Sequence, residues 1–239
     1  AIKGRLLNAS AHYFARLGCG LDKDDSSSRN SPGAELIWPA ERILKTFREV
    51  TELAPNYLPA AYCWARVAAA HLETTVALGL LEKVTNLLLD GCAIPFSCAD
   101  FYFWDPQTQY DIERTAWETL DKGLPLAEGL RPIILEDVLV TAARLANHQG
   151  DLNLVEEALN LAISQHPSGG RARPLLAELL EGQEKWEQAA SIWREHLVIR
   201  PLHFEAHESL VALAGQCETV LISDEEVHRF ERALKVVRG

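Results

Sequence analysis

Two prolines in the C-terminal half of the chain, Pro167 and Pro201, lie 34 residues apart, and the segments before them match in residue type. A period of about 20 to 50 residues is the sequence signature of repeat architectures. The matched positions of the first copy are Ala143, Ala146, Gly150, Leu152, Leu159, Ala162 and Pro167. Those of the second copy are Ala177, Leu180, Glu184, Trp186, Trp193, His196 and Pro201. Small residues recur where two helices would cross closely and large residues where the second helix would fill the gap. Each copy, over residues 136–169 and 170–203, is therefore expected to form one helix pair.

The residues between the breaks follow a helical period rather than a strand period. Apolar residues recur at spacings of three and four, and β-strand signals are scarce. One such stripe is Val155, Ala158, Leu159, Ala162 and Ile163, and another is Ala189, Ile192, Trp193 and Leu197. The breaks at 150–151, 167–170 and 200–201 are short, and short connections between helices indicate antiparallel neighbours. The sequence therefore predicts an all-α fold.

This pattern resembles the tetratricopeptide repeat (TPR), in which two antiparallel helices are followed by a proline that closes the second helix. The resemblance is strong over residues 136–203 and weaker on both sides, where residues 57–62 resemble the opening of a first helix and residues 204–207 continue the pattern. Residues 75–132 depart from the repeat. The resemblance implies an alpha-solenoid of antiparallel helix pairs in a right-handed superhelix, whose first helices line a concave groove.

We expect a single helical-repeat domain over residues 1–239, interrupted by two loops. Residues 21–35 are polar and Ser-rich and lack large apolar residues after Leu21, so they are expected to form a mobile loop. Residues 90–107 are expected to form an irregular loop with a dense aromatic cluster. The cluster consists of Phe96, Phe101, Tyr102, Phe103 and Trp104. We expect a satellite core that pins this long connection, and the alternative is a ligand-binding patch.

The net charge of −11, from 34 acidic and 23 basic residues, bears on the class of partner. Nucleic acid requires a basic surface against its phosphates, and so does an anionic membrane surface. No apolar run reaches the ~18 residues of a membrane-spanning helix. The nearest approach is the run from Leu78 to Leu89, which Glu82 and Lys83 interrupt. We therefore expect neither nucleic-acid binding nor insertion into a membrane.

The sequence carries no arrangement that predicts catalysis, a metal or a cofactor. His203 and His207 would share a helix face, but a zinc site needs a third ligand and the order H-E-x-x-H is absent, so helix packing is the expected role of His207. His196 lies at a position that prefers a small residue, and we expect it to be partly exposed. No Gly-rich phosphate-binding loop and no G-x-S-x-G motif occurs. An enzyme would need a catalytic cluster near residues 90–107, and we do not expect one.

First-helix positions that alternate away from the packing face are expected to line the groove. They are Tyr62, Arg66, Val140, Arg144, Asn147, Arg171, Glu178, Glu181, Glu205 and Glu208. The glutamates would repel the acidic tails that some TPR domains hold with a Lys/Asn/Arg clamp, and Arg144 has no Lys or Asn companion at matching positions. A basic or amphipathic protein segment fits this groove better, with Tyr62 and Val140 offering apolar anchorage toward its other end.

The expected function is that of a non-catalytic protein–protein interaction module, a scaffold or adaptor that binds a peptide or protein segment in its groove. The alternative is a sensory or regulatory TPR domain excised from a larger bacterial transcription regulator of the CadC-like type. Residues 54–62, Ala-Pro-Asn-Tyr-Leu-Pro-Ala-Ala-Tyr, resemble the repeat openings found in those regulators. The two hypotheses differ in the compartment that they imply.

The five cysteines leave the compartment open. They are Cys19, Cys63, Cys92, Cys98 and Cys217. They are too sparse for a disulfide scaffold, and their odd number leaves one unpaired. Cys92 and Cys98 flank a turn-like segment in which two sulfurs could meet, so they form the candidate disulfide. We expect a cytoplasmic protein, or a periplasmic one if Cys92 and Cys98 are bonded.

Overall fold

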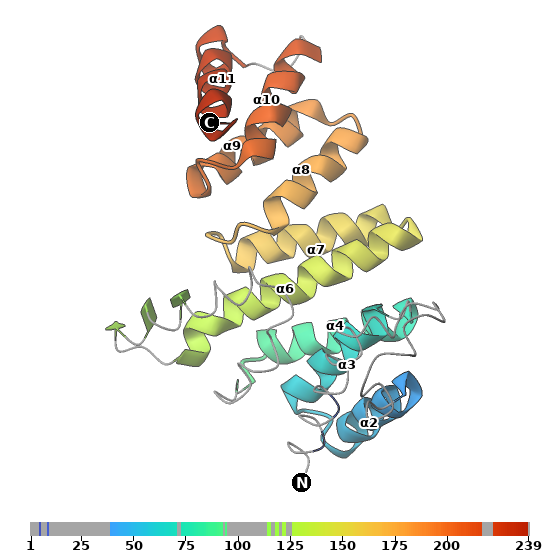
Figure 1. Ribbon diagram of the computed structural model, residues 1–239. Helices are drawn as coiled ribbons and strands as arrows, with labels where there is room; N and C mark the ends of the chain where they lie inside the picture. Colours follow the sequence, from blue (N-terminus) through green and yellow to red (C-terminus); the bar gives the residue numbers. More distant parts are fainter. Residues whose placement is uncertain are drawn as a thin grey trace, which may run out of the picture. The chain divides into compact units, whose positions relative to one another are not determined.

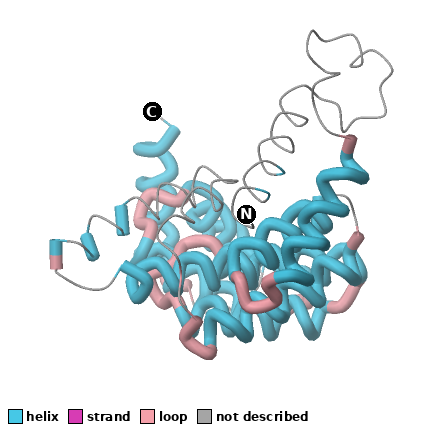
Figure 2. The backbone as a smooth tube through the Cα atoms, turned by 90° about the horizontal axis from the view of Figure 1, so that it is seen from below, coloured by secondary structure: helices cyan, strands magenta, loops and turns pink. Residues whose placement is uncertain are grey.

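The computed structural model describes residues 39–70, 73–92, 126–216 and 222–238, together with residues 5, 9, 94, 114–115, 118–119 and 121–122. Helices and the turns between them account for this described part, which contains no strand (Figure 2). The helices are α2 (Ala40–Leu53), α3 (Leu58–Ala70), α4 (Thr74–Leu89), α6 (Leu126–Gln149), α7 (Leu152–Gln165), α8 (Ala172–Gly182), α9 (Trp186–Ile199), α10 (Phe204–Gln216) and α11 (Asp224–Arg238) (Figure 1). The predicted all-α fold is confirmed. The loop expected at 21–35 and most of the one expected at 90–107 lie outside the described residues.

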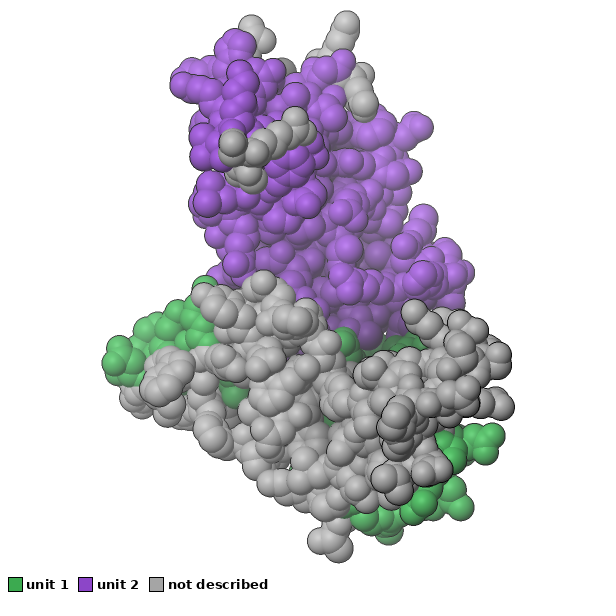
Figure 3. Space-filling model, in the orientation of Figure 1, with its two compact units in different colours: residues 1–131 green, residues 132–239 purple. Residues whose placement is uncertain are grey.

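The chain divides into two compact units where the sequence analysis expects one domain (Figure 3). Unit 1 ends at Arg131 and unit 2 begins at Pro132, so the division falls within α6. Pro132 lies inside this helix. A proline in a helix interior removes one backbone hydrogen bond and clashes with the preceding turn, which makes it a natural point of division.

Unit 1 is built on α3, which packs against both α2 and α4. Four alanines of α3, at positions 60, 61, 65 and 68, are fully buried, because small side chains let neighbouring helices approach closely. Phe47 and Val50 of α2 are also fully buried. Arg131 donates hydrogen bonds from Nη1 to the Leu88 carbonyl (2.7 Å) and from Nη2 to the Cys92 carbonyl (2.9 Å). These bonds tie the start of α6 to the C-terminal end of α4 and to the turn that follows it.

Unit 2 consists of the helix pairs α6/α7, α8/α9 and α10/α11. Helix α7 also packs against α8, and α9 against α10, so each pair contacts the next. Figure 1 shows the α6/α7 pair lying side by side. The core between the pairs holds Val155 and Leu159 of α7, Leu176 and Leu180 of α8, and Trp193 of α9, all of which are buried. Unit 2 is therefore a stack of helix pairs, as the periodicity predicts.

The turns that follow three of the helices share one backbone geometry, and two of them lie 34 residues apart, at His166 and Arg200. Ala54, His166 and Arg200 end α2, α7 and α9 with nearly the same backbone conformation, φ −140°, −133° and −126° and ψ 72°, 72° and 74°. Each donates its N–H to the carbonyl four residues earlier, at 3.1, 2.9 and 2.8 Å. A proline follows each of them, and a proline cannot continue a helix. Pro167 and Pro201 therefore lie at equivalent bends.

The turns between the two helices of the α6/α7 and α8/α9 pairs also share one backbone geometry. Gly150, between α6 and α7, has φ 77°, and Glu184, between α8 and α9, has φ 60°. The Gly150 N–H donates to the Asn147 carbonyl, and the Glu184 N–H makes the corresponding bond to Glu181. A positive φ favours glycine because a Cβ atom crowds the backbone there. Glu184 is the one non-glycine residue with a positive φ in the described part of the chain.

Candidate functional site

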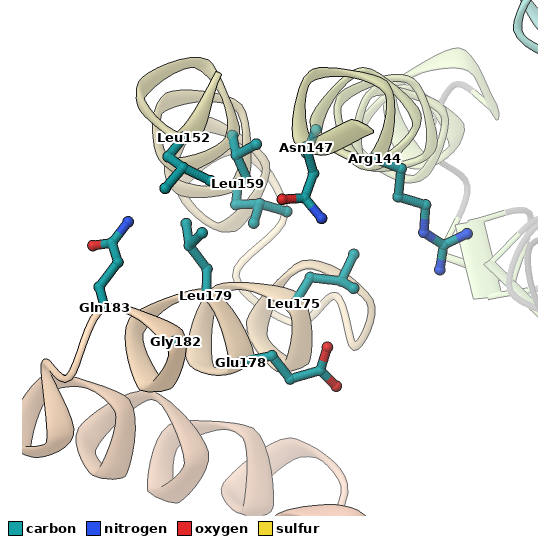
Figure 4. A pocket seen from close by; sticks show the side chains of 11 residues that line it. Arg144, Asn147, Leu152, Leu159, Leu175, Glu178, Leu179, Gly182 and Gln183 are labelled. Atoms are coloured by element: carbon teal, nitrogen blue, oxygen red, sulfur yellow. The ribbon is translucent and has the colours of Figure 1, made fainter. Parts of the chain in front are cut away.

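A cavity of about 320 Å³ opens between α6, α7 and α8 of unit 2; we call it the α6–α8 cavity (Figure 4). Five aliphatic side chains form most of its surface, and we call them the apolar floor. They are Leu152, Val155 and Leu159 of α7 and Leu175 and Leu179 of α8. Arg144 and Asn147 of α6 and Glu178 and Gln183 at the end of α8 supply the polar rim. The volume lies at the lower end of the ~300–1,000 Å³ range of ligand sites in proteins.

Helical spacing explains why these side chains meet. Arg144 and Asn147 are three residues apart on α6, so they project from the same side of that helix. Leu175 and Leu179 are four apart on α8, with Glu178 and Gly182 beside them. Gly182 leaves the end of α8 open, since a Cβ atom added there would meet nothing within 4 Å. Val155 and Leu159 are buried, whereas Leu152 is 41% exposed and Leu175 and Leu179 are half-buried, so these three leucines are the part of the floor that the protein does not cover fully.

The α8 side of the cavity is acidic. Partial burial and the carboxylates of Glu181 and Glu205 raise the pKa of Glu178, while Arg144 and His203 act in the opposite direction. Glu181 accepts a hydrogen bond from Trp193 Nε1 at 2.5 Å, which fixes its carboxylate beside α9. A cation on this side of the cavity would meet the Glu178 carboxylate, and the carboxylates of Glu181 and Glu205 lie close enough to act on Glu178 electrostatically.

Comparison with solved structures shows which known proteins share this fold. MamA is 11% identical with a TM-score of 0.52, over 83% of this chain and 86% of its own. YrrB, described as a TPR protein with an unusual peptide-binding site, is 14% identical with a TM-score of 0.52, over 96% and 93%. The MamA RS-1 ArsTM double mutant is 11% identical with a TM-score of 0.55, over 97% and 94%. The chain has the TPR fold. No family model matches its sequence, and neither does any curated protein.

In a TPR fold the helices that line the cavity have defined roles. Helices α6 and α8 are the first helices of two consecutive repeats, and α7 is the second helix of the earlier one. Three of the residues predicted to line a groove, Arg144, Asn147 and Glu178, lie together at the cavity. Glu181 and Glu205 act on Glu178 electrostatically, so they lie beside the same surface.

Other residues predicted to line the groove lie elsewhere. Tyr62 and Val140 are 1% and 0% exposed, so the prediction that they offer apolar anchorage is wrong. Both lie on helices packed on more than one side, which buries more of the helix circumference than one packing face would. Arg171 is held by an ion pair from Nη1 to Asp137 Oδ1 at 2.7 Å, which gives it a structural role. Arg66 and Glu208 are half-buried on α3 and α10, away from the lining of the cavity.

The sequence analysis missed the apolar floor. It assigned Leu152 and Leu159 to helix packing and did not single out Leu175 or Leu179. A signal was present in α8, where Leu175, Leu176, Leu179 and Leu180 form two adjacent pairs four residues apart. Leu176 and Leu180 are buried in the core, whereas Leu175 and Leu179 are only half-buried. When the apolar stripe of a helix is wider than a single packing face, the helix has a second apolar surface.

His196 at the end of α9 packs against Trp193 and against His203, which precedes α10. His196 is fully buried, which overturns the expectation that it is partly exposed. Its ring lies edge-on to His203 at a centroid distance of 4.5 Å, and Trp193 stacks on His203 at 6.3 Å. His207 Nε2 lies 2.8 Å from the Pro201 carbonyl oxygen, a packing contact as predicted. No group of three or more His, Cys, Asp or Glu with metal-binding geometry occurs in the part of the chain that the structure describes.

The sequence also predicts that no helix spans a membrane and that Cys92 and Cys98 are the candidate disulfide. Among the helices described, none is both long and apolar enough to cross a bilayer. Burial raises the pKa of the Cys92 thiol, although Arg131 lies close by. Cys98 lies outside the described residues, so its pairing with Cys92 stays a prediction.

Proposed function

We propose that this protein is a non-catalytic interaction module that binds a segment of a partner protein in the α6–α8 cavity. The observation that supports the proposal most is the accessible part of the apolar floor, formed by Leu152, Leu175 and Leu179 on α7 and α8. A surface of this kind gains free energy when a partner covers it. The protein-binding scaffolds of the TPR fold, and the peptide-binding site for which YrrB is described, support the same function.

The partner segment is basic or amphipathic. Glu178, Glu181 and Glu205 place negative charge beside the cavity, and complementary charge raises both the rate and the specificity of association. Arg144 gives the opposite rim the opposite sign. No described feature favours the alternative of a sensory domain from a CadC-like regulator.

The proposal is tested by selecting peptides from a random display library against the full chain and then plugging the cavity. The plugging variant is Gly182→Trp, because position 182 borders the cavity and has room for a side chain. Gly215→Trp is the matched control: it makes the same change on α10, also with nothing within 4 Å, and outside the cavity. Selected peptides should lose at least about tenfold in affinity for Gly182→Trp and keep their affinity for Gly215→Trp. Equal affinity for both variants would contradict the proposal.

A further inference from the structure

We infer that the occupant of the α6–α8 cavity is an amphipathic basic helix, with aliphatic side chains one helical turn apart on the apolar floor and a lysine or arginine beside Glu178. The inference rests on the proposed function and adds the secondary structure of the partner and the placement of its charge. Spacing and charge support it independently.

The dimensions of the apolar floor fit a helix. Leu175 and Leu179 are half-buried and lie four residues apart on α8, about 6 Å along the helix axis, and Leu152 at the start of α7 is 41% exposed. A partner helix presents side chains one turn apart at the same distance. Its apolar stripe at positions i, i+4 and i+7 would cover these three leucines.

The volume of the cavity favours side chains that enter it over a flat contact. The cavity of about 320 Å³ has leucine and valine side chains on two of its sides and open space at Gly182. Asn147 and Gln183 provide polar groups at the rim. This is the arrangement of an interface in which a few apolar anchors enter a pocket and polar groups surround them.

The charges place the partner's cation on the α8 side. Arg144 on α6 would repel a lysine or arginine, whereas Glu178 on α8 would attract one. The Glu178 carboxylate has Glu181 and Glu205 as neighbours, so its negative charge is incompletely compensated. Glu178 is exposed, so an ion pair with the partner's lysine or arginine would be screened by solvent and would contribute modestly.

The probes are three synthetic 18-residue peptides, titrated into the full chain and followed by fluorescence anisotropy. The first carries leucines at i, i+4 and i+7 with lysines along one flank. The second has the same composition, with its leucines placed so that no helical face is apolar. The third keeps the leucines of the first and replaces the lysines by glutamates. The first peptide should bind at least about tenfold more tightly than either of the others.

Two variants locate the contacts. Gly182→Trp should weaken the first peptide by at least about tenfold, with Gly215→Trp as its control. Glu178→Gln should weaken it about threefold to fivefold, as expected for one partly exposed ion pair. Glu157→Gln removes an exposed carboxylate of α7 outside the cavity and should leave the affinity unchanged.

The outcomes separate the inference from the proposed function. Equal binding of the three peptides, or tighter binding of the glutamate peptide, overturns the inference. If display-selected peptides compete at the cavity but lack an apolar helical face or a basic flank, the inference fails and the proposed function stands. If Gly182→Trp affects no selected peptide, both fail.

Discussion

On α6, Oε2 of the Glu136 carboxylate lies 2.7 Å from Nδ1 of His166 at the end of α7. Its Oε1 accepts hydrogen bonds from the backbone N–H groups of Arg171 (2.9 Å) and Ala172 (3.2 Å), where α8 begins. Burial raises the pKa of Glu136, but the bonds from His166, Arg171 and Ala172 outweigh it, and the pKa is lowered overall. One buried carboxylate thus joins three helices around the cavity.

Replacement of Glu136 by glutamine should lower the free energy of unfolding by about 2 kcal/mol, because charge-assisted hydrogen bonds become weaker or are lost. Gly169→Ala should also destabilise the protein, since a Cβ atom at position 169 would overlap the Glu136 carboxylate. Chemical denaturation measures both changes. Glu157→Gln on the exposed side of α7 is the control and should change stability little. A neutral Glu136→Gln would contradict the proposed structural role.

The contribution of Glu136 to stability should depend on pH. Because the pKa of Glu136 is lowered in the folded state, its contribution is complete above the ordinary glutamate pKa of ~4.3 and is lost as the pH falls through the folded value. The difference in unfolding free energy between wild type and Glu136→Gln should therefore be constant from pH 7 to pH 5 and shrink below pH 4. A difference that grows on acidification would contradict the assignment.

His196 should give a second pH dependence at higher pH. Burial, followed by the nearby His203, Arg173 and Arg200, lowers its pKa to about 4. An unfolded chain has histidine pKa values near ~6.5, so between pH 6.5 and pH 4 the unfolded state binds more protons. Stability should therefore fall as the pH decreases through this window, by up to ~1.4 kcal/mol per pH unit.

The variant His196→Ala tests this dependence, because the equivalent position in the preceding repeat is Ala162. It should flatten the stability profile between pH 6.5 and pH 4, as measured by denaturation midpoints across that range. It should also lower stability at pH 7, since it leaves a cavity beside Trp193. An unchanged slope would show that another group carries the dependence.

A substitution in the turn between α8 and α9 should make the protein more stable. Glu184 has φ 60° where the equivalent Gly150 has φ 77°. Glu184→Gly should raise the free energy of unfolding by about 0.5–1 kcal/mol, because it relieves backbone strain at a small cost in unfolded-state entropy. Gly150→Ala should lower it by about 1 kcal/mol. Thermal unfolding compares the two variants, and effects of equal sign would contradict this explanation.

The parts of the fold that follow local rules could be predicted from the sequence. Pro167 and Pro201 fixed two equivalent bends because proline cannot continue a helix, and the match of Gly150 with Glu184 located a repeated turn. The environment of His196 could not be predicted in this way. It depends on which neighbours cover a position, and Trp193 and His203 cover it fully.

The charged residues of the candidate site could be predicted from the sequence, but its apolar residues could not be predicted one by one. Arg144 and Glu178 were identified because a charged side chain on a helix faces away from the core. Taken singly, Leu175 and Leu179 look like core leucines in the sequence, and only the width of the apolar stripe that they form with Leu176 and Leu180 indicates a second surface. Tyr62 was assigned to the groove from its position on one helix, but its burial depends on the packing of other helices against α3.

Hydrogen exchange of the full chain, with and without a display-selected peptide at saturating concentration, tests the central claim most directly. If the α6–α8 cavity binds the partner, amide protection should increase within residues 143–152 and 175–183, the two segments that contain most of its lining residues. It should not increase on the face of α7 that carries Asn153 and Asn160, away from the cavity. Protection confined to that face of α7, or to unit 1, would contradict the claim.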